Sequence, residues 1–291
     1  IEKLSRGVSA FLTSVGVDGG VAELLGRGEV QAIVVAASLL PQCPLPSSAL
    51  FAAAGTPDAL AHLRSQIEIG KQRDATRAKL LEKYQVEFLR LDHLAQLDAL
   101  SRASAKPGLV RWLSVRAAVN KLRPYCKVPK VDPVQLRADL DVALTLTRVS
   151  RALSADKLAT DAFGVRWNAD TPNWAELEKQ LLWSEQFRKS ISPLDRTDHG
   201  RGIAQALSQL ATHADRCEAA KPVASSLVGS WKFWTDAWAK AKQLLVTTGD
   251  TAFKGGTEAA WLPLVAQTFT RWMSGLPELN NWCAWRQARD E

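Results

Sequence analysis

Methionine and tyrosine are scarce in this 291-residue chain, which has one Met and two Tyr but eleven Trp. Cysteine is also sparse: Cys43, Cys126, Cys217 and Cys283 lie far apart, and no two of them form a Cys-x-x-Cys pair. That spacing gives no sign of a disulfide framework and predicts free thiols in a reducing cytoplasm. The abundance of Trp predicts that large indole rings serve as packing blocks.

A long apolar run is missing as well. A membrane-spanning helix needs about 18 predominantly apolar residues, whereas the richest run, Ala32–Leu40, is short and stops at Pro41. The chain begins at Ile1 with neither a Met nor a signal-like segment. We therefore expect a cytoplasmic protein without membrane contact, and an internal piece of a longer chain.

Motifs for nucleotide chemistry and hydrolysis are absent. A phosphate-binding loop needs Gly-x-x-x-x-Gly-Lys followed by Ser or Thr, but the only Gly-Lys pair, Gly70-Lys71, precedes Gln72 in a helical stretch. No Asp-Glu pair follows an apolar strand, and no Ser-His-Asp, Cys-His or paired-carboxylate arrangement has a supporting local context. The sequence predicts no catalytic residue, no enzyme activity and no bound cofactor for this piece.

A metal site has little support. His213 and Cys217 lie one helical turn apart, and Asp198-His199 is close in sequence. A structural zinc ion needs four ligands, and the remaining ones are unassigned, so we predict no metal site.

Sustained alternation of polar and apolar residues is absent too, which predicts an all-α fold with almost no strand. Residues 1–55 form short helical patterns broken by Gly and Pro and are expected to be an N-terminal helical cap. Thr56-Pro57-Asp58 begins a helical pattern that continues to about Leu100. A cross-piece near 107–125 and a return helix over 133–159 complete a predicted antiparallel, coiled-coil-like arm over 56–160.

Residues 161–291 are expected to form a Trp-rich helical bundle. Its central helix is predicted to start with Thr171 as the cap and Pro172 at the first helical position. Two adjacent apolar faces indicate a helix buried between neighbours, and they hold Trp174, Leu177 and Leu181, and Trp183, Phe187 and Ile191.

Four further helices are expected over 203–219, 223–247, 257–275 and 277–291. Trp231, Trp234 and Trp238 follow the spacing of one helix face. Such a face is either a buried packing surface, which we favour, or a stacking platform for single-stranded bases.

Charge is the strongest local feature. No acidic residue occurs between Ala99 and Val131, in a chain whose net charge is +7. The basic segment consists of eight residues: Arg102, Lys106, Arg111, Arg116, Lys121, Arg123, Lys127 and Lys130. At the tip of an arm, such a segment would bind phosphates by counterion release, without reading base sequence. The alternatives are a solvated basic turn and a segment that docks on an acidic protein surface.

Within the predicted cross-piece helix, the cations and the apolar residues are expected to separate. Arg116, Arg123 and Lys127 fall near one side. Trp112, Leu113 and Leu122 are then available to pack elsewhere.

Four stretches carry a family resemblance. Asp161–Ile191 looks like a turn followed by a helix that starts Asp-Thr-Asp-Trp, and Ile67–Tyr84 and Phe88-Leu89-Arg90-Leu91-Asp92 look like the same family's charged helix and the step after its Tyr. The spacing of Trp272, Leu276, Leu279, Trp282 and Trp285 is similar to its last helix. These stretches, in this order, resemble a helical region of large bacterial superfamily-one DNA helicases. Those proteins are multidomain, occur in defence loci and end in a Vsr-like endonuclease domain. Val86 departs from the pattern, because relatives often carry Pro there.

The resemblance implies an accessory region between the two ATPase motifs of an ATP-dependent parent. ATP and magnesium would belong to the parent's motor domains, and the implied partners are DNA and the parent's helicase and nuclease domains. The expected role is DNA contact through the basic segment, in a bacterial protein of phage defence. The alternative is a protein-interaction scaffold that positions the helicase or nuclease domains or a partner.

Overall fold

The computed structural model describes residues 2–127, 132–167 and 172–247. Within these ranges the chain is all-α, as predicted, and its single β-type contact is an isolated antiparallel bridge between Tyr84 and Cys126. The chain falls into two compact units, the first Ile1–Leu45 with Gln186–Glu291 and the second Pro46–Glu185. The expected division into 1–55, 56–160 and 161–291 stays a prediction.

The first unit is built from helices at both ends of the described chain. Its elements are α1 (Glu2–Ser14), η1 (Gly19–Leu24), α2 (Arg27–Leu39), η2 (Leu40–Gln42), η6 (Leu194–Arg196), α10 (Asp198–Thr212) and α11 (Ala214–Thr247). Helix α11 packs against α1, α2 and α10. Apolar side chains such as Phe11, Ile33 and Leu207 are fully buried in this unit.

The predicted break between 219 and 223 is wrong, because α11 continues through Pro222. The break lies at His213, where the backbone is extended and α10 ends. Cys217 and Ala220 are buried before Pro222, and Ala224 and Leu227 are buried after it. Packing on both sides of the proline therefore holds one helix, although proline removes a backbone hydrogen bond. The helices predicted over 257–275 and 277–291 lie outside the described residues.

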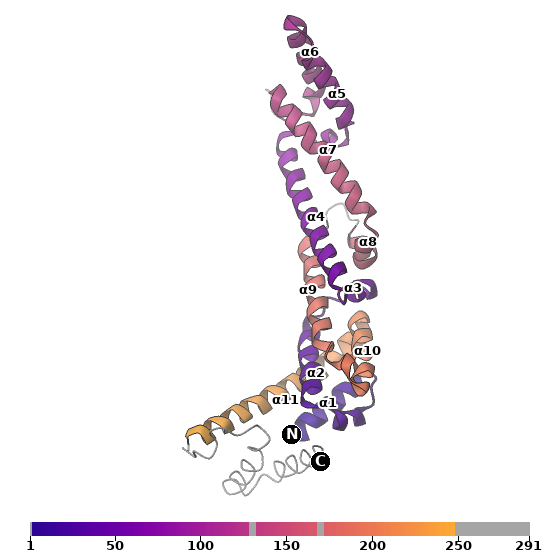
Figure 1. Ribbon diagram of the computed structural model, residues 1–291, viewed down its shortest axis with the longest axis vertical. Helices are drawn as coiled ribbons and strands as arrows, with labels where there is room; N and C mark the ends of the chain where they lie inside the picture. The colour runs from indigo at the N-terminus through magenta and orange to yellow at the C-terminus, as the bar shows by residue number, and fades with distance from the viewer. Residues whose placement is uncertain (1, 128–131, 168–171, 248–291) are drawn as a thin grey trace. The chain divides into compact units, whose positions relative to one another are not determined.

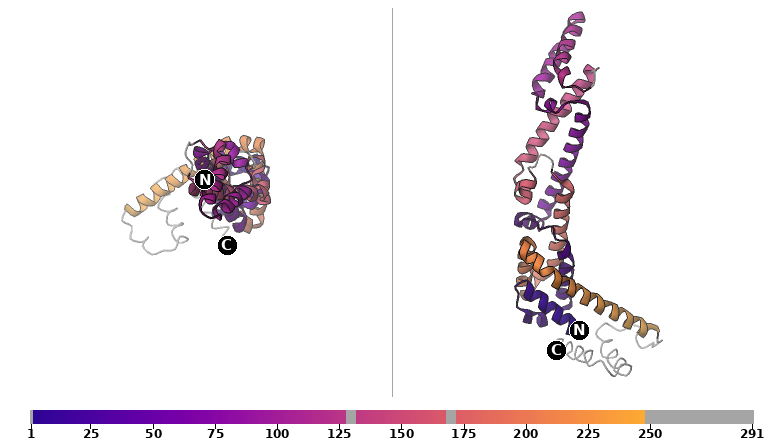
Figure 2. Two further views of the ribbon diagram at one scale, coloured as in Figure 1. Left: turned by 90° about the horizontal axis from the view of Figure 1, so that it is seen from above. Right: turned by 180° about the vertical axis from the view of Figure 1, so that it is seen from behind.

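The second unit is an assembly of antiparallel helices. Its elements are α3 (Ser48–Ala53), α4 (Pro57–Lys83), η3 (Val86–Arg90), α5 (His93–Ser104), α6 (Gly108–Leu122), η4 (Arg123–Tyr125), α7 (Pro133–Ala155), α8 (Lys157–Phe163), η5 (Gly164–Arg166) and the first turns of α9 (Trp174–Ile191). Helices α4 and α7 run side by side, as Figure 1 and the right-hand view of Figure 2 show. Helix α5 packs on both α6 and α7.

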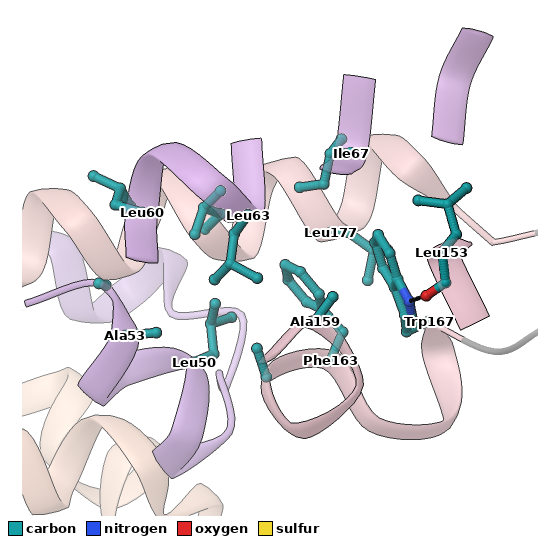
Figure 3. Packing of buried hydrophobic residues seen from close by; sticks show 13 residues of the cluster. Leu50, Ala53, Leu60, Leu63, Ile67, Leu153, Ala159, Phe163, Trp167 and Leu177 are labelled. Atoms are coloured by element: carbon teal, nitrogen blue, oxygen red, sulfur yellow. Dashed lines mark hydrogen bonds between the residues drawn. The ribbon is translucent and has the colours of Figure 1, made fainter. Parts of the chain in front are cut away.

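One core of the second unit lies where α3, α4, α8 and α9 meet, shown in Figure 3. Leu63 and Ile67 of α4 contact this core together with Leu177 of α9. The buried Trp167 ring packs in this core, and its Nε1 donates a hydrogen bond to the Leu153 carbonyl at 2.9 Å. Aromatic rings thus serve as packing blocks here, as the Trp content predicts.

A second core lies under α5 and α6. Phe88, Leu136 and Leu140 are fully buried in it, and Tyr84 stacks on Phe88 with ring centroids 4.0 Å apart. The Tyr84 hydroxyl donates to Asp139 Oδ2 at 2.8 Å, and Gln135 Nε2 donates to Asp139 Oδ1 at 2.9 Å. These bonds satisfy a carboxylate that would be costly to bury alone.

The helical pattern predicted to continue from Thr56 to about Leu100 is wrong beyond Lys83. Tyr84 has an extended backbone and pairs with Cys126. Gln85 N donates to the Tyr125 carbonyl at 2.8 Å, and Lys127 N donates to the Lys83 carbonyl at 2.8 Å. This long-range pairing takes the backbone groups that a continuous helix would have used, so the chain turns before α5.

Burial of α9 agrees with the sequence-based expectation. Leu177, Leu181, Trp183, Phe187 and Ile191 are all buried, whereas Trp174 is partly buried. The start differs from the prediction, because α9 begins at Trp174 and the Asn173 Oδ1 accepts a hydrogen bond from Glu176 N at 3.3 Å. Thr171, the predicted cap, lies outside the described residues.

Candidate nucleic-acid interface

The basic segment covers the end of the second unit formed by α5, α6 and η4. Local caps set its course: Asp92 Oδ1 accepts from Ala95 N at 3.1 Å at the start of α5, and Gly108 has a φ of +54° at the start of α6. The pairing of residues 83–85 with 125–127 then fastens the far side of this hairpin to the end of α4. Backbone hydrogen bonds to residues 83–85 therefore hold the segment where it reaches residues 125–127.

Seven of the eight predicted contact residues fall in the described ranges, and all seven are exposed: Arg102, Lys106, Arg111, Arg116, Lys121, Arg123 and Lys127. Lys130 lies outside those ranges. Across the described residues, none of the seven forms an ion pair with a carboxylate. Their positive charge is therefore open to an anionic partner.

Two of the seven contact backbone oxygens instead. Lys127 Nζ donates to the Leu81 carbonyl at 2.6 Å, in the last turn of α4. The helix dipole also stabilises a cation at this end of α4. Arg102 Nε donates to the Asp98 carbonyl at 3.3 Å within α5. Lys127 thus has a structural partner in addition to any contact with phosphate.

The cations of α6 do not share one face. An α-helix turns by about 100° per residue, so Arg116 and Arg123 lie roughly 20° apart, whereas Arg111 lies roughly 140° from Arg116. Arg116, Arg123 and Lys127 were expected near one side of the helix. The spacing of Arg116 and Arg123 is consistent with this, but Lys127 lies beyond α6 and η4, where its backbone pairs with Lys83. Arg111 and Lys121 point to other sides of α6.

The prediction that Trp112 and Leu113 pack elsewhere is wrong, although Leu122 is buried. Trp112 is 56% exposed and Leu113 is 52% exposed. The Arg116 guanidinium lies over the Trp112 ring, 5.1 Å from its centroid. Helix α6 buries a single residue, Leu122, in its last turn, whereas its first turns, which carry Trp112, are exposed throughout residues 108–113.

This exposed apolar group was missed in the sequence, although a spacing marks it. Leu109, Trp112, Leu113 and Arg116 follow the i, i+3, i+4, i+7 pattern of one helix face. Leu109 is 75% exposed. An arginine within an otherwise apolar face is the feature that distinguishes it from a core-facing helix.

Gly70-Lys71 has a packing role in place of a phosphate-binding one. Gly70 is buried in α4 directly under Trp174, whose Cη2 lies 2.2 Å from where a Cβ on residue 70 would be. Lys71 Nζ donates to Glu178 at 2.8 Å and to Glu68 at 2.7 Å. The hydrogen bond to Glu178, and then that to Glu68, raises the pKa of Lys71.

The Trp face of α11 is only half-buried. Trp231 and Trp234 have ring centroids 5.2 Å apart, and Trp234 and Trp238 are parallel at 6.4 Å. The rings therefore pack on one another along the helix.

The candidate metal ligands have other partners. His213 Nδ1 lies 2.8 Å from the Gln209 carbonyl oxygen, and Cys217 forms a side-chain hydrogen bond with Cys43. That bond lowers the pKa of Cys217 and, with burial, raises the pKa of Cys43. Within the described ranges, no three His, Cys, Asp or Glu side chains gather in a way that could hold a metal ion. Cys283 lies outside those ranges.

Comparison with other proteins gives no family assignment. No protein-family model matches the chain. No curated protein matches it, and neither does any solved structure. Among the helices that the structure describes, none has the length and apolarity for a membrane span.

Proposed function

We propose that this chain is a non-catalytic accessory region of an ATP-dependent DNA helicase and that it contacts DNA through the basic segment. The observation that carries the proposal is the set of seven exposed cations without a carboxylate partner in the described part of the chain. Lysine and arginine side chains in this state bind a polyanion by releasing its counterions, which does not depend on base sequence.

The architecture of the second unit supports this role. Helices α4 and α7 pack side by side, and α5 and α6 continue from their ends (Figure 1). We propose that this pair acts as an arm and that the basic segment is its tip. A rigid paired support would hold the cations in fixed positions and reduce the entropy lost on binding.

The chemistry of the helicase is assigned to the parent protein. ATP and magnesium would bind on its motor domains, and this region would guide or grip DNA beside them. The helicase assignment rests on the resemblance of the four sequence stretches.

The proposal is tested by titrating the 291-residue chain into fluorescently labelled single- and double-stranded DNA at two or more salt concentrations. We expect affinity to fall steeply with salt. Arg116→Ala with Arg123→Ala should reduce the slope of log K against log salt for single strands by about 1.4, because each lost phosphate contact removes roughly 0.7. A slope that the double variant leaves unchanged contradicts contact at these arginines.

A matched control removes the same charge from elsewhere in the second unit. Arg151 and Lys157 are exposed near the core that contains Leu153, and their replacement by Ala should leave the slope unchanged. Equal losses from both pairs would mean that net charge alone, and not this end of the unit, drives binding.

The second candidate is a protein-interaction scaffold that positions the helicase or nuclease domains or a partner. The exposed Leu109, Trp112 and Leu113 side chains favour it, because clustered apolar groups at a surface often mark a protein contact. Absence of DNA binding at low salt would leave this candidate standing and reject the first.

A further inference from the structure

We infer that Trp112 and Arg116 of α6 form a base-stacking site for single-stranded nucleic acid. The inference rests on the proposed DNA contact and adds to it the kind of strand that is bound. Its foundation is an indole ring that is 56% exposed while an arginine lies 5.1 Å from its centroid. Exposed aromatic rings stack on unpaired bases of any sequence, and arginine strengthens such a platform.

The positions of the arginines on α6 indicate which kind of ligand fits the exposed Trp112 face. At about 100° per residue, Arg116 falls between Trp112 and Leu113 when α6 is viewed down its axis. Arg123 falls within the same sector. Arg116 and Arg123 therefore lie within the apolar face of α6 and not along its edges.

A lipid surface fits this arrangement poorly. Helices that lie in a membrane interface bury an apolar face and keep Lys and Arg on the polar side. Burying the Trp112 face in lipid would bury the Arg116 guanidinium with it. An apolar protein groove carries the same penalty, since an unpaired buried charge is costly.

A single strand of nucleic acid supplies both kinds of contact at once. Its bases offer flat apolar faces to Trp112, and its phosphates offer anionic oxygens to Arg116 and Arg123. A duplex offers only the phosphates, because its bases are stacked within the helix. The absence of acidic residues from Ala99 to Val131 keeps repulsion of the phosphates low.

The test compares three labelled probes by fluorescence anisotropy with the full chain: an oligothymidine, an abasic oligomer of equal length, and a duplex. We expect oligothymidine to bind more tightly than the abasic oligomer. Trp112→Ala should weaken oligothymidine binding roughly tenfold, the order of one stacked base, and leave the other two probes unchanged. Trp112→Phe, which keeps a flat ring, should retain most of the affinity.

Val110→Ala is the matched control. Val110 is 54% exposed and, two residues from Trp112, lies roughly 160° around the helix. It should bind all three probes like the unaltered chain. Circular dichroism should give the same helix content for each variant, since both side chains are exposed.

The outcomes separate this inference from the function on which it rests. Salt-dependent binding that Trp112→Ala does not change would overturn the stacking site and leave the DNA contact intact. No binding of any probe at low salt would overturn both. The chain could instead bind anionic phospholipid vesicles, and Trp112→Ala could abolish that binding without an effect on oligothymidine. This result would identify a membrane surface, and not a single strand, as the ligand of Trp112.

Discussion

Gly70 and Trp174 form a contact whose energy can be isolated by a double-mutant cycle. Gly70 lies in the interior of α4, where replacement by Ala ordinarily stabilises a helix by about 0.5–1 kcal/mol. At this site the new Cβ would lie 2.2 Å from Cη2 of Trp174. Carbon atoms in contact are normally about 3.5–4.0 Å apart, so the ring must move.

The displaced ring would lose specific partners. Trp174 Nε1 donates to Asp74 Oδ2 at 2.6 Å, and its ring meets Trp167 edge-on at 5.5 Å. Overpacking costs roughly 1–3 kcal/mol, which exceeds the helix-propensity gain. We expect Gly70→Ala to lower the free energy of unfolding by a net of about 0.5–2 kcal/mol, the overpacking cost less the helix-propensity gain.

The sign should reverse once the ring is removed. In a Trp174→Ala background, Gly70→Ala should stabilise by about 0.5–1 kcal/mol, because only helix propensity then remains. Trp174→Ala alone should destabilise by about 3 kcal/mol, at the low end for a large aromatic residue because this ring is only partly buried. The coupling between the two positions is the difference between the two effects of Gly70→Ala.

Urea unfolding followed by far-ultraviolet circular dichroism measures the four free energies, and hydrogen exchange in α4 assigns the transition to the second unit. Gly202→Ala is the matched control, since Gly202 is exposed within α10 and a Cβ there would meet nothing within 4 Å. It should stabilise by about 0.5–1 kcal/mol in either background. If Gly70→Ala stabilises the unaltered chain as much as Gly202→Ala does, the close approach of Trp174 is refuted.

Two further predictions concern the Tyr84–Asp139 network. Asp139→Ala leaves the buried Tyr84 hydroxyl without its acceptor and should lower the free energy of unfolding by about 2–4 kcal/mol in urea, with a smaller loss for Asp139→Asn. Burial, followed by the hydrogen bond to Asp139, raises the pKa of Tyr84 above its ordinary 10.0. The unfolded chain therefore loses this proton first, and the stabilisation present below pH 10 is lost as the pH rises above it. The difference in unfolding free energy between the unaltered chain and Tyr84→Phe should shrink as the pH rises above about 10, and a constant difference would contradict the assignment.

The starts of α4 and α7 could be predicted from the sequence because their causes are local. Proline at the first helical position places the start of α4 at Pro57, and the Asp132 side chain accepts from Val134 N at 3.2 Å at the start of α7. Each case needs only a few neighbouring residues. The sequence therefore predicted where these two helices begin.

Interruptions of helices could not be predicted in this way. The break at Tyr84 depends on an isolated bridge to Cys126, which is distant in sequence. The continuation of α11 through Pro222 depends on the burial of Cys217 before the proline and of Leu227 after it. In both places tertiary contacts override the local preference, and a single sequence does not display those contacts.

The candidate site also has features that the sequence predicts and features that depend on tertiary contacts. The charged residues could be identified from composition alone, since a long window without acid is visible in the sequence. The exposure of Trp112 was harder to identify, because it depends on whether another helix covers that part of α6, and only Arg116 among the residues at this spacing signals it. Its helical spacing is the same for a buried face and for an exposed one.

The second unit has separate apolar cores for its two ends, which bears on how the basic segment is held. Helix α4 has buried residues up to Gly70 and again at Leu80, and none between 71 and 79. Polar contacts occupy that interval, among them the bonds of Lys71 to Glu68 and Glu178. The basic segment therefore depends on the Phe88 core beneath it, while the core around Leu63 supports the opposite end of the unit. Because apolar packing acts through direct contact, weakening one core need not displace the other.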